Sequence, residues 1–133
     1  MITNGVDIVS IARIEAAVAR SGDAFWKRVC SEEERAIVPS NDVRKIEFLA
    51  GRFAAKEAVS KALGTGIGGK GVSMTDMKIL KKENGAPYVV LSGSALEVYE
   101  NGGGTSISLS ISHDEGMAVA FCCIEWKDAE GKS

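Results

Sequence analysis

The sequence lacks any apolar run that approaches the roughly 20 residues needed to span a bilayer, and it is poor in cysteine, proline and histidine. Its N-terminus also lacks the basic residues and following apolar stretch that are typical of a secretory signal. These absences predict a protein of the cytoplasm that has no membrane association.

Cysteine is represented by Cys30, Cys122 and Cys123 alone. The number is odd, and no pair has the C-x₂-C spacing of a zinc site or redox motif. Neither a disulfide framework nor a structural zinc site is therefore expected, and a reducing compartment fits best.

Charge of either sign is not in large excess, because 16 Lys and Arg oppose 18 Asp and Glu for a formal net charge of -2. That balance excludes a bulk basic field for nucleic acid and an acidic disordered tail. The 133 residues, 45% of them hydrophobic, suit a single domain over residues 1–133, with a frayed polar tail from about 127 to 133.

The patterning predicts helices mixed with antiparallel hairpins. Helices are expected at 11–20, after a Ser10 cap and before Gly22, at the Ser31-x-x-Glu34 capping box, at 43–63 up to Gly64, and after a second capping box at Ser94-x-x-Glu97. Strands are expected at 4–9 (buried), 72–81, 87–91, 107–112 and 117–126, with an Asn84-Gly85 hairpin turn. This order predicts an α+β fold in which a long central helix packs on antiparallel hairpins.

Glu57 is the first residue whose placement points to a site. On a helical projection of 43–63 it falls within an apolar face, while three cations point to the opposite side. The apolar face holds Val43, Ile46, Leu49, Ala50, Phe53 and Ala54, and the cations are Lys45, Arg52 and Lys56. One alternative is an ordinary Glu57–Lys61 pair at i, i+4. A carboxylate on a core-facing ridge otherwise needs a partner or a metal.

Asp7 is a second acid in an apolar element, the strand at 4–9. Two inward carboxylates suggest a cation, and oxygen ligands suit Mg²⁺, which completes its shell with water and substrate phosphates. The alternative is that Asp7 is a hydrogen-bonded residue at a strand end or a cap for the next helix. The sequence does not establish that the two acids meet.

Three further features have both a functional and a structural interpretation. The glycine-rich loop 64–71, with Lys61 and Lys70, could hold phosphates or be a flexible connection. His113 ends the alternating strand and is either catalytic or a packed strand-end residue. Arg13 and Arg20 fall on one helix face and form either a solvated surface or a dock for an acidic protein.

Three blocks of the chain resemble the holo-acyl-carrier-protein synthase type of the 4'-phosphopantetheinyl transferase family. They are GVDIVSIARIE at 5–15, RFAAKEAVSKALGTGI at 52–67, and ISLSISH at 107–113 followed by MAVA at 117–120. Their order and spacing also agree with that family, so the resemblance covers nearly the whole chain.

The resemblance assigns roles to individual positions. Asp7 and Glu57 match the Mg²⁺-binding acids, and Arg13, with Arg20 on the same stripe, matches the arginine that docks the carrier protein. Coenzyme A contacts are implied for Arg52, Lys61, Gly66, Gly85, Pro87 and His113. Ala86 departs from the family, in which a basic residue is common at that position. Similar enzymes are homotrimers with active sites between protomers.

The implied reaction is the Mg²⁺-dependent transfer of 4'-phosphopantetheine from coenzyme A to a serine of apo-acyl-carrier protein, which releases adenosine 3',5'-bisphosphate and supports fatty acid biosynthesis. Catalytic roles fall to Glu57, Lys61 and His113, and the base could be Glu57, a water on the metal or His113. Two other functions remain as alternatives: a Mg²⁺-dependent pyrophosphohydrolase and a noncatalytic module that binds carrier proteins.

Overall fold

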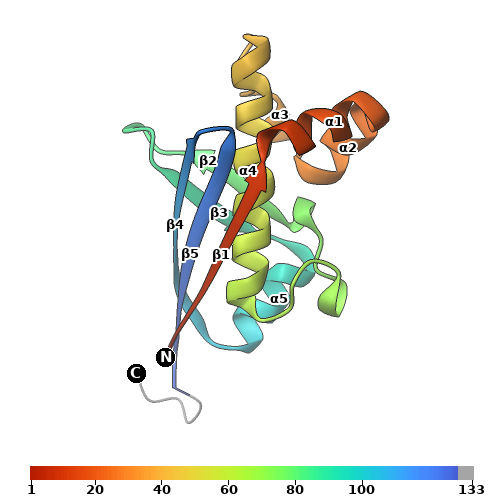
Figure 1. Cartoon of the computed structure of the whole chain (residues 1–133). Coiled ribbons are helices and arrows are strands. Elements are labelled where there is room, and N and C mark those ends of the chain that lie inside the picture. The colour runs from red at the N-terminus through yellow and green to blue at the C-terminus, as the bar shows by residue number, and fades with distance from the viewer. Residues whose placement is uncertain (129–133) are drawn as a thin grey trace.

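Helix α4 (Asp42–Leu63) runs through the centre of the molecule in a computed structural model that describes residues 1–128 (Figure 1). A three-stranded antiparallel sheet in the order β1-β5-β4 covers one side of α4, and a β2-β3 hairpin forms a second sheet. The strands are β1 (Ile2–Ser10), β2 (Met77–Lys81), β3 (Pro87–Leu91), β4 (Gly104–Asp114) and β5 (Met117–Trp126). The predicted α+β fold, with a long helix on antiparallel hairpins, is confirmed.

The shorter helices lie at the two ends of α4. Three of them form a cluster beside its N-terminal half, and the fourth lies near its C-terminal end (Figure 1). The cluster consists of α1 (Ile11–Ser21), α2 (Asp23–Val29) and α3 (Glu32–Arg35), and the fourth helix is α5 (Gly93–Asn101). Two 3₁₀ turns, η1 (Gly69–Gly71) and η2 (Met74–Asp76), connect α4 to β2.

Small residues allow the sheet to lie very close to α4. Ala54 and Ala58 of the helix and Ala118 and Ala120 of β5 are all buried in the core. At Gly5 of β1 the approach is closer still, because a Cβ atom there would lie 2.1 Å from the carbonyl oxygen of Ala58. Only glycine fits at this contact, and it sets β1 against the helix two residues before Asp7.

Most of the local signals in the sequence are confirmed. Ser10 Oγ accepts a hydrogen bond from Arg13 N at 3.3 Å as the α1 cap, and Gly64 ends α4 with a φ of 86°. The Ser31–Glu34 capping box is present in full. Gly85 adopts a φ of 86° in the turn between β2 and β3.

Two element boundaries were predicted wrongly. The strand expected from residue 72 begins at Met77, because Ser73 and Asp76 form a capping box around the η2 turn. The capping box expected at Ser94 is absent, since α5 begins at Gly93 and the carboxylate of Asp76 accepts from Ala95 N at 3.2 Å. This cap comes from another element, so the local sequence around α5 did not reveal it.

The burial of α4 differs from the projection. Arg52 and Lys56 were predicted on a polar side but are 5% and 0% exposed, whereas Val43, predicted on the apolar face, is 69% exposed. The α2–α3 segment and β2 cover the side of α4 that was assigned to solvent. The helix is therefore enclosed along much of its length, and its buried cations have partners inside the protein.

The strand β1 was predicted as buried, but only one of its faces is. Gly5 and Val9 face the core, while Val6 and Ile8 are 54% and 62% exposed on the outer face of the sheet. Among residues 1–128 no helix has the length and apolar character needed to cross a membrane. The tail predicted from residue 127 falls largely outside the described residues.

Candidate active site

Asp7 and Glu57 line the same cleft, which has a volume of about 470 Å³ and lies where β1, α1 and α4 meet. We call it the α1 cleft; its charged lining consists of Asp7, Arg13, Arg20, Arg28 and Glu57. The two acids are brought together although fifty residues separate them in the sequence. Arg13 and Arg20 are exposed at its rim, as the predicted basic stripe requires.

The environment of Glu57 disfavours its charged form. Partial burial raises the pKa of Glu57 most, the negative charge of Asp7 raises it further, and Lys61 acts in the opposite direction. The side chain of Asp7 is only 16% exposed. Two carboxylates that repel each other in a partly dry cleft would both be stabilised by a cation.

Lys61 contacts Asp7 rather than Glu57. Its Nζ donates to the carbonyl oxygen of Val6 at 2.9 Å and to Asp7 Oδ1 at 3.3 Å, and the side chain remains 49% exposed. No Glu57–Lys61 salt bridge occurs in the part of the chain that the structure describes. Ser10 caps α1, so the cap role considered for Asp7 is not found either.

The donor set of the α1 cleft fits Mg²⁺ with substrate oxygens in the remaining positions. Within residues 1–128 no group of three or more His, Cys, Asp or Glu side chains could hold a metal on its own. Mg²⁺ commonly takes one or two protein carboxylates and completes its octahedron with water and phosphate oxygens. Asp7 and Glu57 supply that number.

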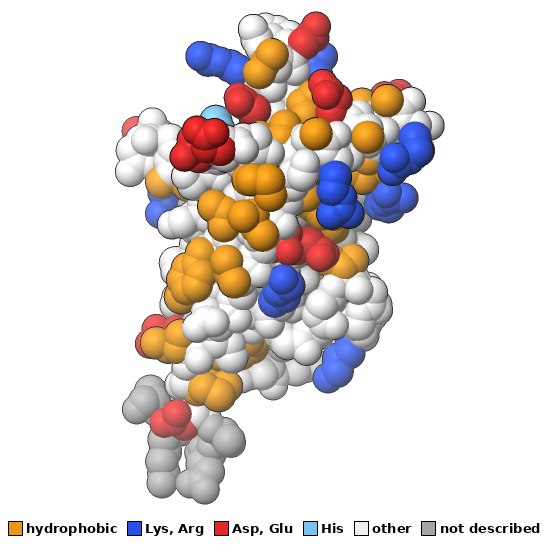
Figure 2. All heavy atoms as spheres, viewed as in Figure 1, with side chains coloured by type: hydrophobic (Ala, Val, Ile, Leu, Met, Phe, Trp, Pro, Cys, Tyr) orange, Lys and Arg blue, Asp and Glu red, His pale blue; other side chains and the backbone are white. Residues whose placement is uncertain are grey.

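Two aromatic side chains are among the residues that line the α1 cleft. The rings of Phe25 and Phe53 stack with their centroids 6.1 Å apart, and the guanidinium of Arg28 lies 5.2 Å from the centre of the Phe25 ring. Basic side chains gather over α1 and α2 beside this region (Figure 2). Sequence reasoning gave Phe25 no role, because nothing in its local pattern separates a cleft residue from a core residue.

A second pocket, of about 400 Å³, contains His113 and Arg52. We call it the β4 pocket; His113 lines it together with the charged side chains of Arg44, Glu47, Arg52 and Lys81. His113 is 53% exposed, and its Nδ1 lies 3.8 Å from Glu47 Oε2. Arg44 and Lys81 were not recognised from the sequence as candidate site residues.

Arg52 is held firmly at the inner wall of the β4 pocket. Its Nη2 donates to the carbonyl oxygen of Ile79 at 3.1 Å, and its Cζ lies 4.0 Å from the centre of the Phe48 ring. Burial lowers the pKa of this guanidinium, and Nε has no hydrogen-bond partner among the described residues. An anion in the pocket would stabilise this buried cation.

Most of the candidate site residues thus fall into two groups within one chain, while Lys61 and Gly66 lie toward the C-terminal end of α4. Glu47, the neighbour of His113, precedes Glu57 by ten residues on α4, which corresponds to about 15 Å along the helix axis. Pro87 pairs with Lys81 on the β2–β3 hairpin and Gly85 lies in its turn, near the β4 pocket. Gly66 follows the end of α4, where its N–H donates to Ser60 O at 3.1 Å.

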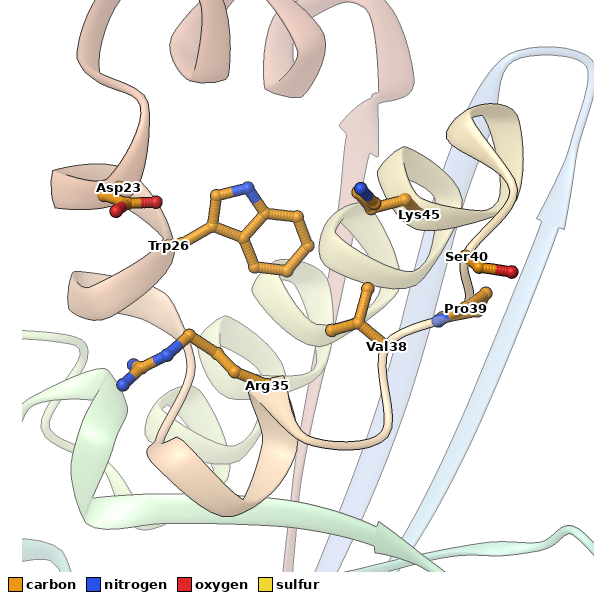
Figure 3. A pocket seen from close by; sticks show the side chains of 7 residues that line it. All are labelled: Asp23, Trp26, Arg35, Val38, Pro39, Ser40 and Lys45. Atoms are coloured by element: carbon orange, nitrogen blue, oxygen red, sulfur yellow. The ribbon is translucent and has the colours of Figure 1, made fainter.

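Two further hollows lie elsewhere on the described surface. One, of about 580 Å³, includes Lys61, Lys70 and Trp126 and continues from the end of α4 toward α5. The other, of about 360 Å³, lies between α2, α3 and the start of α4, and is lined by Trp26, Arg35 and Lys45 (Figure 3). No residue predicted for the site lines the second hollow.

The sequence as a whole matches one family model and many curated proteins. The model of the 4'-phosphopantetheinyl transferase superfamily matches residues 4–122. A holo-[acyl-carrier-protein] synthase from Ruminiclostridium cellulolyticum is 43% identical over 125 residues, which cover 94% of this chain and 92% of the relative.

Solved structures of similar proteins have the same fold. The crystal structure of holo-[acyl-carrier-protein] synthase from Neisseria meningitidis matches with a TM-score of 0.85 and 37% identity, covering 94% of this chain and 99% of the other. That of the Helicobacter pylori protein in complex with coenzyme A matches with a TM-score of 0.80 and 42% identity, covering 94% and 100%.

Proposed function

The chain belongs to the 4'-phosphopantetheinyl transferase superfamily, and from this we propose the reaction that its site performs. It transfers the 4'-phosphopantetheine group of coenzyme A to a serine of apo-acyl-carrier protein and releases adenosine 3',5'-bisphosphate. The transfer supports fatty acid biosynthesis. The observation that carries the proposal is the meeting of Asp7 and Glu57 in the α1 cleft, with Lys61 hydrogen-bonded to Asp7.

Asp7 and Glu57 would hold the Mg²⁺ of this reaction. When bound, Mg²⁺ neutralises negative charge on the phosphates and so favours attack at phosphorus. The mutual repulsion of the two carboxylates and the raised pKa of Glu57 support this assignment, because a divalent cation relieves both.

Lys61 supplies a second positive charge beside the acids. Its ammonium group has three N–H donors, and Val6 O and Asp7 Oδ1 use two of them. The third is available for a phosphate oxygen of coenzyme A, and the two contacts with β1 fix the direction of the side chain. Glu57 accepts the serine proton in this proposal, since it lies in the cleft that the carrier protein approaches.

We further propose that complete sites form between protomers of a homotrimer. His113 and Arg52 lie in the β4 pocket, apart from the acids of the same chain, so they would serve the α1 cleft of a neighbouring copy. Exposed apolar side chains on the outer face of β1 and β5 support an assembly; they include Val6, Ile8 and Phe121, which is 46% exposed. The cations of the β4 pocket, with Gly85 and Pro87 nearby, would hold coenzyme A phosphates.

The decisive experiment is to incubate the protein with coenzyme A, Mg²⁺ and an apo-acyl-carrier protein, and to measure the mass of the carrier protein by mass spectrometry. A mass gain of one phosphopantetheine group supports transfer. Loss of coenzyme A without labelling of the carrier would indicate a pyrophosphohydrolase instead. Complex formation without either change would indicate a noncatalytic binding module.

Arg13→Glu is expected to raise KM for the carrier protein about tenfold while KM for coenzyme A stays within about twofold. Arg13 is exposed at the rim of the α1 cleft, so reversal of its charge should slow association with an acidic partner. Steady-state kinetics for both substrates at several ionic strengths measure the effect. A defect confined to coenzyme A would contradict the docking role.

His113→Ala is expected to lower turnover by at least about tenfold without loss of the fold. The side chain is half-exposed at the end of β4, so its removal leaves the core unchanged. Circular dichroism and steady-state rates measure the two effects, with Asp114→Asn as a control at the exposed neighbouring position. An unfolded His113→Ala protein would support the strand-end packing role instead.

The rate at which Cys123 is alkylated is expected to depend on whether the protein is trimeric. Burial raises the pKa of Cys30 to about 11 and that of Cys122 to about 12, so neither thiol should react at neutral pH in the native protein. Cys123 lies on the outer face of β5 and should react slowly in the trimer and faster on dilution to monomer. Equal Cys123 reactivity in trimer and monomer, sized by sedimentation, would place the interface elsewhere.

A further inference from the structure

Lys56 and Glu34 form an ion pair in the interior, with both side chains 0% exposed. Lys56 Nζ donates to Glu34 Oε1 at 2.6 Å and also to the carbonyl oxygen of Val29, the last residue of α2. The ammonium group of Lys56, on α4, thus binds directly to both α2 and α3. None of the roles proposed above uses this pair.

The same pair connects α4 to the β2–β3 hairpin. Glu34 Oε2 accepts from the backbone N–H of Ile79 at 3.0 Å, and Arg52 donates to the carbonyl oxygen of the same residue at 3.1 Å. The backbone N–H and C=O of Ile79 lie on the edge of β2 that does not pair with β3. Side chains, those of Glu34 and Arg52, therefore satisfy both groups. Glu34 Oε1 also accepts from Ser31 N at 2.9 Å, which completes the α3 capping box.

Stability alone does not require charges at this place. Apolar side chains of similar volume often replace a buried ion pair with no loss of stability, and in some proteins buried charged groups instead specify one geometry. Lys56 can affect the geometry around Glu57, because the two residues are neighbours on α4. Successive residues on a helix are rotated by about 100°, so Glu57 faces the α1 cleft while Lys56 faces the end of α2.

Helix α2 forms one wall of the α1 cleft. Phe25 and Arg28 of α2 line the cleft, and Phe25 stacks on Phe53, which lies one turn before Glu57 on α4. The Lys56–Val29 hydrogen bond holds the C-terminal end of α2, one residue after Arg28. The Lys56 hydrogen bond thus contributes, together with the buried side chains of Phe25 and Val29, to the position of this wall relative to Glu57.

We propose that Lys56 is a positioning residue for the carrier protein: it holds α2 against α4 and so places Phe25 and Arg28 at the correct separation from Glu57. This inference rests on the proposed transfer function. It assigns to Lys56 an effect on the seating of the acidic carrier through α2, a helix that carries none of the proposed coenzyme A contacts.

The test uses a double variant, Glu34→Gln with Lys56→Met, because Lys56→Met alone leaves a buried carboxylate without its counter-charge and endangers folding. The amide introduced by Glu34→Gln still offers an acceptor to Ile79 N, but α4 no longer holds the carbonyl of Val29. Lys78→Met is the matched control, since Lys78 also pairs with an acid of α3, Glu33, but at the surface.

We expect the double variant to fold, to keep KM for coenzyme A within about twofold, and to raise KM for the carrier protein about tenfold, the scale of one lost aromatic pair. Amide hydrogen exchange should become faster in α2 and stay unchanged in α4. Arg28→Ala should weaken carrier use in the wild type and add little in the double variant, because the two changes act through one contact.

Three outcomes would overturn the inference: unchanged carrier KM in the folded double variant, equal increases in KM for both substrates, or the same increase in Lys78→Met. Absence of carrier labelling by the wild type would refute the proposed function instead. In that case the exchange of α2 amides still tests whether Lys56 holds the helix, so the two failures are distinguishable.

Discussion

Glu57→Gln should lower the rate of phosphopantetheine transfer by several orders of magnitude while the metal-free protein stays folded. The substitution keeps the size of the side chain and removes the charge that would hold Mg²⁺ together with Asp7. Each ~1.4 kcal/mol of lost transition-state stabilisation lowers the rate about tenfold, so the loss of one ligand and one base suffices for a large effect. Transfer rates over a Mg²⁺ titration measure it.

The stability of Glu57→Gln follows from the raised pKa of Glu57. A carboxyl group whose pKa is higher in the folded state contributes stability at low pH, and this contribution is lost as pH rises through the folded pKa. At neutral pH the native carboxylate therefore favours unfolding, and its removal should leave the thermal midpoint of the metal-free protein equal or slightly higher. Differential scanning calorimetry without metal measures this midpoint.

The matched control is Glu100→Gln, which makes the same change at an exposed position on α5. It should alter neither transfer nor the thermal midpoint. Partial recovery of Glu57→Gln at high Mg²⁺ would agree with weakened coordination. Near-normal transfer by the folded variant would exclude the metal-binding role, and a fall in activity that merely follows the folded fraction would indicate a structural role.

Gly5→Ala should destabilise the protein by about 3 kcal/mol, at the upper end of the range for overpacked cores. The added Cβ would lie 2.1 Å from Ala58 O and 2.9 Å from Ala62 N. Both atoms belong to the backbone of a long helix, which cannot shift to relieve the clash. Strand β1 must therefore move away from α4. Since β1 carries Asp7, the folded fraction should also lose transfer activity.

Gly51→Ala provides the control for this prediction. Gly51 lies inside α4, and a Cβ atom there would meet only a methyl group of Ile111 at 3.2 Å. Because alanine favours a helix over glycine, the net change in stability should stay within about 1 kcal/mol. Urea unfolding of the three proteins measures the difference, and a wild-type midpoint for Gly5→Ala would show that β1 does not lie so close to α4.

Local patterns in the sequence predicted most elements of the fold but not their mutual placement. Caps such as Ser10, Ser31 and Gly64 act on their own helices, so the sequence around each one reveals it. The cap of α5 is Asp76, which belongs to another element, and it was missed. The short helix α2 has too few residues for a helical period to be recognised.

For the candidate site, too, the sequence revealed individual residues but not how they are placed relative to one another. The unusual position of Glu57 is visible in the sequence, because a helical projection needs only neighbouring residues. Its meeting with Asp7 depends on the packing of β1 on α4, for which no local signal exists. The projection failed at Arg52 and Lys56, because it assumes that one side of a helix faces water, whereas α4 is covered on both sides.

The close contact between β1 and α4 affects how residue conservation should be interpreted among proteins of this fold. Gly5 performs no chemistry, yet any side chain there collides with the backbone at Ala58. Selection should therefore hold Gly5 invariant as strictly as it holds an acid that binds metal. A ranking of positions by evolutionary variability would then place the glycine beside Asp7 and Glu57, and only the physical reason for each constraint separates the packing residue from the reactive ones.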